Sequence, residues 1–224
     1  MEHQKDTPLT DGRDTAAQAR DSVRTLLFLV IMLAAYLLLW QLLTSFFDFP
    51  VYYYGRLIEL LALMLFAALA LATSMNFEEM GIVVPRKTLF RSLALGLFLA
   101  LLFVAALALT QLATNKKLQF FWHIRGDIAR ATYFLVAPFQ EVLAKSVMLY
   151  SFERVLGGKH GHAANLLCAL TFGAFHVVYG FKMMLMAMAL SLVTGLLFRK
   201  YRCVWGCAVT HFACGFFPLC FGFM

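Results

Sequence analysis

Long apolar runs alternate with short polar loops along most of this chain. A helix needs about 20 apolar residues to cross a bilayer, and seven segments reach or approach that length. They lie near residues 25–47, 56–74, 90–113, 131–152, 164–181, 183–198 and 203–222. The pattern predicts an all-α, polytopic transmembrane helical bundle of about seven spans, within a range of six to eight.

The fifth and sixth apolar segments are shorter than the others, and Gly180 and Lys182 lie near their junction. Irregular backbone at membrane depth is tolerated where it is buried in protein. These two segments are therefore predicted either as a bent helix or as a tight hairpin within the bilayer.

The first 23 residues are polar, mixed in charge and nearly free of large apolar side chains. Such a segment buries too little apolar surface to order itself. We expect residues 1–23 to be a disordered cytoplasmic tail and residues 24–224 to be a single transmembrane domain.

Composition supports lipid as the solvent. The chain is 62% hydrophobic and 14% charged, whereas soluble domains carry about 25% charged residues. The net charge of +7 comes from basic residues in short loops, without a basic stripe on a soluble segment. We therefore expect the bilayer as a partner and no nucleic acid.

Basic residues in the loops orient the predicted spans. Twelve of them fall on one side, and the richer side is normally cytoplasmic: Lys5, Arg13, Arg20, Arg24, Arg86, Lys87, Arg91, Arg154, Lys159, Arg199, Lys200 and Arg202. Six fall on the other side: Arg56, Lys116, Lys117, Arg125, Arg130 and Lys182. The expectation is an integral protein of the bacterial inner (plasma) membrane with a cytoplasmic N-terminus.

Four polar residues lie inside these apolar segments: Gln140, Glu141, His176 and His211. Ionisable groups in hydrocarbon are costly, so each is a functional candidate. Glu141 and Lys145 have the i, i+4 spacing of a helical ion pair. Gln140 can hold a water but cannot act as a base. His176 and His211 can act as bases or can stabilise an oxyanion, which favours the activation of water.

Three stretches around these residues resemble motifs of the CAAX prenyl protease and bacteriocin-processing family, also called CPBP or Abi. APFQEVLAKSVMLY resembles its Glu-Glu-x-x-x-Arg helix, and Phe172 to His176 matches its Phe-x-x-x-His motif. GLLFRKYRCVWGCAVTHFACG resembles its third motif, in which Asn or Asp follows the His by four residues. The similarity covers about residues 130–217.

The resemblance implies a glutamate-type intramembrane protease with a catalytic core over this range. In the family the first Glu and the second-motif His are thought to activate water, which maps to Gln140 and His176. The third-motif His and its Asn are thought to bind the oxyanion, which maps to His211 and Gly215. The second Glu, here Glu141, is thought to pair with the Arg, here Lys145.

Three positions depart from the family pattern, and Gln140 is the most consequential because it replaces the expected base. Gln140 is either a deliberate substitution that silences the base, or a natural feature of a pseudo-protease, or a sign that Glu141 serves as the base. Lys145 keeps the charge of the Arg, and Gly215 lacks a side-chain donor.

We therefore expect an endopeptidase that cleaves a membrane-associated peptide or protein by carboxylate- and His-activated water, and that Gln140 slows or silences. The catalytic set is Gln140, Glu141, His176 and His211, supported by Lys145, Phe172 and Gly215, with no cofactor and no metal. One alternative is a non-catalytic membrane protein that binds a peptide as an immunity or sorting partner. Another is a metalloprotease with Glu141, His176 and His211 as ligands.

Overall fold

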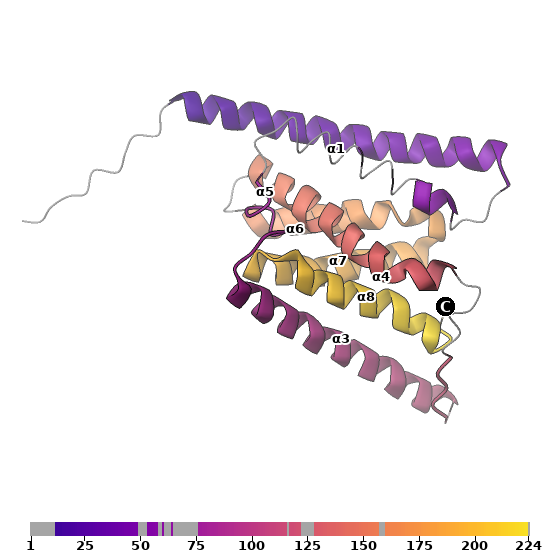
Figure 1. Ribbon diagram of the computed structural model, residues 1–224. Coiled ribbons are helices and arrows are strands. Elements are labelled where there is room, and N and C mark those ends of the chain that lie inside the picture. The colour runs from indigo at the N-terminus through magenta and orange to yellow at the C-terminus, as the bar shows by residue number, and fades with distance from the viewer. Residues whose placement is uncertain are drawn as a thin grey trace, which may run out of the picture.

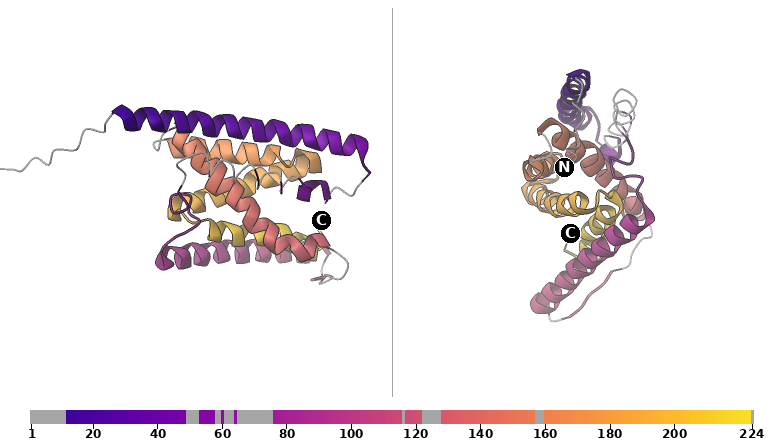
Figure 2. Two further views of the ribbon diagram at one scale, coloured as in Figure 1. Left: turned by 45° about the horizontal axis from the view of Figure 1, so that its top comes forward. Right: turned by 90° about the vertical axis from the view of Figure 1, so that its left-hand side faces the viewer.

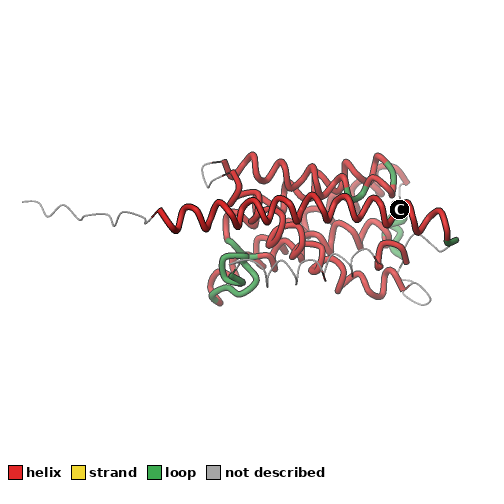
Figure 3. The backbone as a smooth tube through the Cα atoms, turned by 90° about the horizontal axis from the view of Figure 1, so that it is seen from above, coloured by secondary structure: helices red, strands yellow, loops and turns green. Residues whose placement is uncertain are grey.

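The computed structural model describes residues 12–48, 53–57, 60, 64, 76–115, 117–121, 128–156 and 160–223. Within these residues the chain is helix and loop, without strands, as predicted (Figure 3). The elements in chain order are α1 (Gly12–Phe46), α3 (Arg86–Asn115), α4 (Ile128–Glu141), the π-helix η1 (Val142–Leu149), α5 (Tyr150–Leu156), α6 (Gly161–Ala174), the 3₁₀ turn η3 (Val177–Tyr179), α7 (Phe181–Tyr201) and α8 (Val204–Cys220).

Three of the described helices are long and apolar enough to cross a membrane: residues 20–46, 86–114 and 181–201. Helix α8 is apolar but shorter. Many large apolar side chains on α1 and α3 point outward, such as Leu38 and Leu109, which are 72% and 66% exposed. Exposed apolar surface on this scale fits contact with lipid, so the chain is an integral membrane protein.

Helices α1 and α3 lie on opposite sides of the molecule, and the remaining helices lie between them (Figures 1 and 2). Helix α8 is central because it packs against α3, α4 and α7, whereas α1 packs on α5. Helices α6 and α7 pack along each other and are separated by η3 and by Gly180, whose φ is +100°. Of the two arrangements predicted for these segments, the structure therefore has the hairpin.

Small residues allow α3 and α8 to approach closely. A Cβ atom added at Gly96 would overlap the backbone of Gly206, and one added at Gly206 would overlap the backbone of Ser92. The Thr210 hydroxyl donates to the Gly96 carbonyl at 3.2 Å across the same seam. Close approach through glycines, with hydroxyl hydrogen bonds between helices, is typical of packing in membranes.

Helix α1 begins at Gly12, inside the segment that we expected to be a disordered tail. Residues 12–23 contain several Ala, Arg and Gln residues, which are strong helix formers. Because they continue directly into a long apolar helix, they extend an existing helix and need no new nucleus. Residues 1–11 lie outside the described residues, as does most of the predicted span 56–74, of which residues 56, 57, 60 and 64 are helical.

Charged side chains gather where α1, α5 and α7 meet. Arg154 lies 3.7 Å from Asp21. Glu153 accepts a hydrogen bond from Arg199 at 3.2 Å and forms an ion pair with Arg202 at 2.5 Å. The count of basic loop residues places Arg154, Arg199 and Arg202 on one side of the membrane. Asp21 and Glu153 are sequence neighbours of Arg20 and Arg154, which belong to the same side. The ion pairs hold that end of the bundle together.

Candidate active site

The helix that carries Glu141 changes its winding at that residue. Helix α4 ends at Glu141, and the next eight residues form the π-helix η1. In a π-helix the backbone bonds join residues five apart, so side chains four apart are no longer aligned. Such π-segments occur often at functional sites.

The wider winding explains why the predicted contact between Lys145 and Glu141 is absent. Both residues are described, and no ion pair joins them within 4 Å. The Lys145 ammonium instead donates to the Ser191 hydroxyl at 2.7 Å and to the Ser191 carbonyl at 2.9 Å on α7. The i, i+4 argument was wrong here because it assumed α-helical winding.

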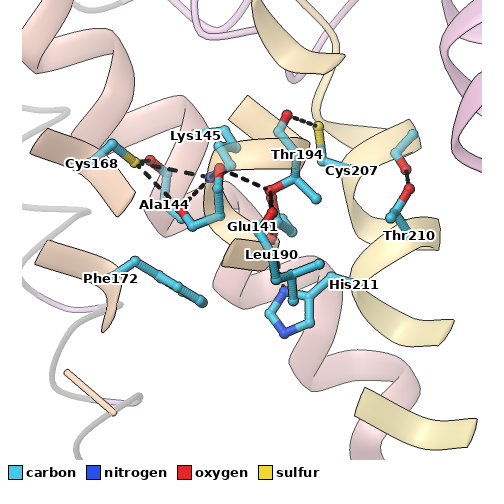
Figure 4. Close-up of polar contacts among 12 residues, drawn as sticks. Glu141, Ala144, Lys145, Cys168, Phe172, Leu190, Thr194, Cys207, Thr210 and His211 are labelled. Atoms are coloured by element: carbon cyan, nitrogen blue, oxygen red, sulfur yellow. Dashed lines mark hydrogen bonds and ion pairs between the residues drawn. The ribbon is translucent and has the colours of Figure 1, made fainter. Parts of the chain in front are cut away.

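Glu141 contacts His211 directly. Its Oε1 lies 2.9 Å from Nδ1 of His211 on α8, and the Thr194 hydroxyl donates to the same oxygen at 3.5 Å. Glu141 is 0% exposed and His211 is 4% exposed. Figure 4 shows the Glu141 side chain between Lys145 and His211. An ionised carboxylate can only accept, so Nδ1 of His211 carries the hydrogen and the ring is held in one orientation.

His176 lies just beyond the end of α6. Its Nδ1 lies 2.7 Å from the Phe172 carbonyl oxygen one turn earlier. A carbonyl oxygen can only accept, so Nδ1 carries the hydrogen and Nε2 of the neutral ring is the acceptor. The local hydrogen bond thus presets the tautomer that a general base requires.

The Phe172 ring connects the two histidines. Its centroid lies 4.7 Å from that of His176 and 5.9 Å from that of His211. The structure therefore brings together Glu141, Phe172, His176 and His211 from three separate stretches of the chain. Gln140 lies beside Glu141 in the last turn of α4 and is half-buried.

Tyr133 is a neighbour that the sequence analysis missed. Its ring centroid lies 6.3 Å from that of His211, and its hydroxyl lies where a Cβ atom of Gly215 would be. Tyr133 precedes Gln140 by seven residues, which places both on one face of α4. That spacing was the available signal, but nothing local showed that Gly215 would face it.

The described residues contain no group of three His, Cys, Asp or Glu side chains that could hold a metal ion. Nδ1 of each histidine is hydrogen-bonded within the protein, which leaves Nε2 as the nitrogen that a ligand or a substrate would meet.

Comparison with known proteins gives one match. Residues 128–217 match the family model described as Type II CAAX prenyl endopeptidase Rce1-like. A search of curated proteins found no match, and neither did a search of solved structures. The matched segment contains all three motifs. Its family supports an intramembrane endopeptidase of the CAAX type, a hydrolase that acts on membrane-associated proteins. Residues 128–217 therefore match the CAAX protease family, as the three motifs predicted.

Proposed function

We propose that this chain is an intramembrane endopeptidase of the bacterial plasma membrane whose reaction centre lies among Gln140, His176 and His211. The observation that carries the proposal is the 2.9 Å contact between Glu141 and His211. A buried carboxylate that orients an imidazole is a recurring device of hydrolytic sites. The second imidazole, His176, is joined to this pair through the Phe172 ring.

In the proposed reaction His176 takes a proton from a water molecule through Nε2. The water oxygen bonds to the carbonyl carbon of the peptide, and the carbonyl electron pair moves to its oxygen. His211 donates a hydrogen bond from Nε2 to that oxygen in its protonated form, which Glu141 stabilises. The carbon–nitrogen bond then breaks, and the leaving amine takes the proton from His176.

Gln140 makes this form slow or inactive. A Gln amide can hold the attacking water by hydrogen bonds, but it cannot take up a proton. A carboxylate at this position would share the proton transfer with His176. General acid–base catalysis contributes about 100- to 10,000-fold, so the loss of one partner lowers the rate severely.

Glu141 is the other carboxylate near the centre. Its Oε1 is bonded to His211, whereas its Oε2 is buried without a hydrogen-bond partner. We had expected Lys145 to form an ion pair with Glu141. The Lys145 ammonium instead donates to Ser191, so Glu141 has no direct ion pair with it. This supports Glu141 as the source of residual activity while residue 140 is Gln.

Aromatic side chains line the approach to His176. Its ring lies 6.1 Å from Tyr179, and Tyr179 lies 5.8 Å from Trp40 on α1. The Tyr36 hydroxyl donates to the Phe175 carbonyl, which fixes α1 next to the end of α6. An apolar, aromatic wall beside a hydrolytic centre suits a membrane-associated peptide or protein.

The test compares the chain with its Gln140→Glu variant in liposomes that contain a library of membrane-anchored peptides. We expect the Glu variant to release fragments at least about 100-fold faster, as seen by mass spectrometry. Gln119→Glu, an exposed change outside the site, controls for added charge, and His162→Ala is the matched control for His176→Ala.

Peptide binding without cleavage is the second candidate function. Gln140 itself favours a non-catalytic membrane protein that captures a peptide in the same site. Binding without cleavage in both the Gln and Glu forms would establish it. Cleavage by Gln140→Glu that His176→Ala does not reduce would also contradict the proposed mechanism.

A further inference from the structure

The side chain of Tyr133 fills the space that a side chain at Gly215 would need. The hydroxyl of Tyr133, on α4, lies against Gly215 on α8, where any side chain at position 215 would overlap it. Gly215 lies one turn after His211, so the phenol stands beside the imidazole on the same side of α8. The 6.3 Å separation of the two ring centroids agrees with this placement.

The position suits a hydrogen-bond donor. A tyrosine phenol offers one O–H donor at the end of a rigid side chain. Tyr133 shares a face of α4 with Gln140, the residue beside Glu141, so its hydroxyl borders the space in which we place the reaction. Tyr133 is half-buried, which limits competition from bulk solvent.

We infer that the Tyr133 hydroxyl donates a hydrogen bond to the carbonyl oxygen of the peptide and is the second donor beside His211. The inference rests on the proposed function. Gly215 is required because only a residue without a side chain leaves room for the phenol. The hydroxyl keeps its proton throughout, and it stabilises the negative charge that forms on oxygen when water adds to the carbon.

The first test uses Tyr133→Phe in the Gln140→Glu background, with a peptide that this background cleaves. Removal of one oxyanion donor lowers kcat by about 100- to 1,000-fold. We expect a fall of that order with KM nearly unchanged, because the bond strengthens mainly as charge develops. A change confined to stability or KM would mean that the ring only packs, and would overturn the inference.

A residue exchange tests the shared space. Tyr133→Ala with Gly215→Asn places an amide donor in the space of the phenol, and we expect it to recover a large part of the lost rate. Tyr133→Ala with Gly215→Ala fills space without a donor and is the matched control, which should recover none. Equal recovery by both pairs would overturn the inference.

A binding measurement separates this inference from the proposed function. A trileucine aldehyde forms a tetrahedral hydrate, whereas the matching alcohol does not. We expect the full chain in detergent to prefer the aldehyde, and Tyr133→Phe to abolish that preference. If no variant cleaves peptides but the preference depends on Tyr133, the inference stands and the proposed turnover fails. If Gln140→Glu cleaves and Tyr133→Phe alters neither rate nor preference, the inference fails alone. If neither cleavage nor preference is found, both fail.

Discussion

A hydrogen bond between Glu141 and His211 sets the chemistry of the buried site at the scale of single residues. Both groups are removed from solvent, so their attraction is far less screened than at a surface. The bond fixes which nitrogen of His211 carries hydrogen and leaves Nε2 as the nitrogen that is not held by Glu141.

Glu141→Gln should therefore disable the site even where residue 140 is Glu. The amide can donate to Nδ1 as well as accept from it, so His211 loses both its fixed tautomer and its counter-charge. We expect cleavage by the Gln140→Glu background to fall by about 100-fold or more. Steady-state kinetics would show this, with the exposed change Glu78→Gln as the control. An unchanged kcat would remove Glu141 from the mechanism.

Ser191 and Lys145 form a second buried polar contact near Glu141. Ser191→Ala deletes the 2.7 Å hydrogen bond and leaves the ammonium with the Ser191 carbonyl. A hydrogen bond to a charged group contributes about 1.5–3 kcal/mol, so the free energy of unfolding should fall by about that amount. Denaturant titration in detergent measures it, and Thr110→Ala on the exposed face of α3 is the control. Equal stability of the two variants would contradict the contact.

The sequence pattern identified the candidate site residues but was a poorer guide to the partners that their side chains contact. Gln140, Glu141, His176 and His211 stand out because they are polar in apolar segments. The partner of Lys145 was misjudged because no local signal announces a π-helix. Tyr133 was missed because a tyrosine in an apolar segment is unremarkable until the fold places Gly215 opposite it.

At the scale of elements, the seam between α3 and α8 positions His211. Gly96 and Gly206 allow the two backbones to approach, and Thr210, the residue before His211, bonds across the seam. The apolar runs at 90–113 and 203–222 predicted both helices. The pairing of α3 with α8 depends on contacts between residues more than 100 positions apart, which periodicity does not encode.

Gly206→Ala should disturb this seam because its Cβ would overlap the Ser92 backbone. Overpacking of a close interface typically costs about 1–3 kcal/mol. We therefore expect thermal unfolding in detergent to show a lower unfolding temperature for Gly206→Ala than for the parent chain. Leu97→Ala, at a side chain that is 53% exposed, is the control and should change stability little. A Gly206→Ala protein as stable as its parent would contradict the packing.

At the scale of the whole molecule, the described part of the bundle combines an apolar exterior with a strongly charged end. Asp21, Glu153 and three arginines tie α1, α5 and α7 together there. The count of basic loop residues had predicted a shared side for the three arginines. We propose that this end faces the cytoplasm, in line with the excess of basic residues.

Sidedness can be measured with a thiol reagent that does not cross membranes. Four of the five native cysteines are buried and Cys214 is half-buried, so the parent chain sets a low background. Lys87→Cys and Lys117→Cys lie at exposed positions on opposite predicted sides. In intact spheroplasts we expect labelling at 117 and none at 87, and the reverse in inside-out vesicles. Labelling of both from one side would contradict the predicted topology.

The hydrolytic character of the site is the central claim, and the most direct measurement is the fate of solvent oxygen. Gln140→Glu protein in liposomes would cleave a membrane-anchored peptide in water enriched in oxygen-18, and the fragments would be weighed. The account predicts labelled oxygen in the new carboxyl group and no fragments from the same protein with His176→Ala. Absence of fragments from Gln140→Glu, or equal labelled product from the His176→Ala protein, would contradict it.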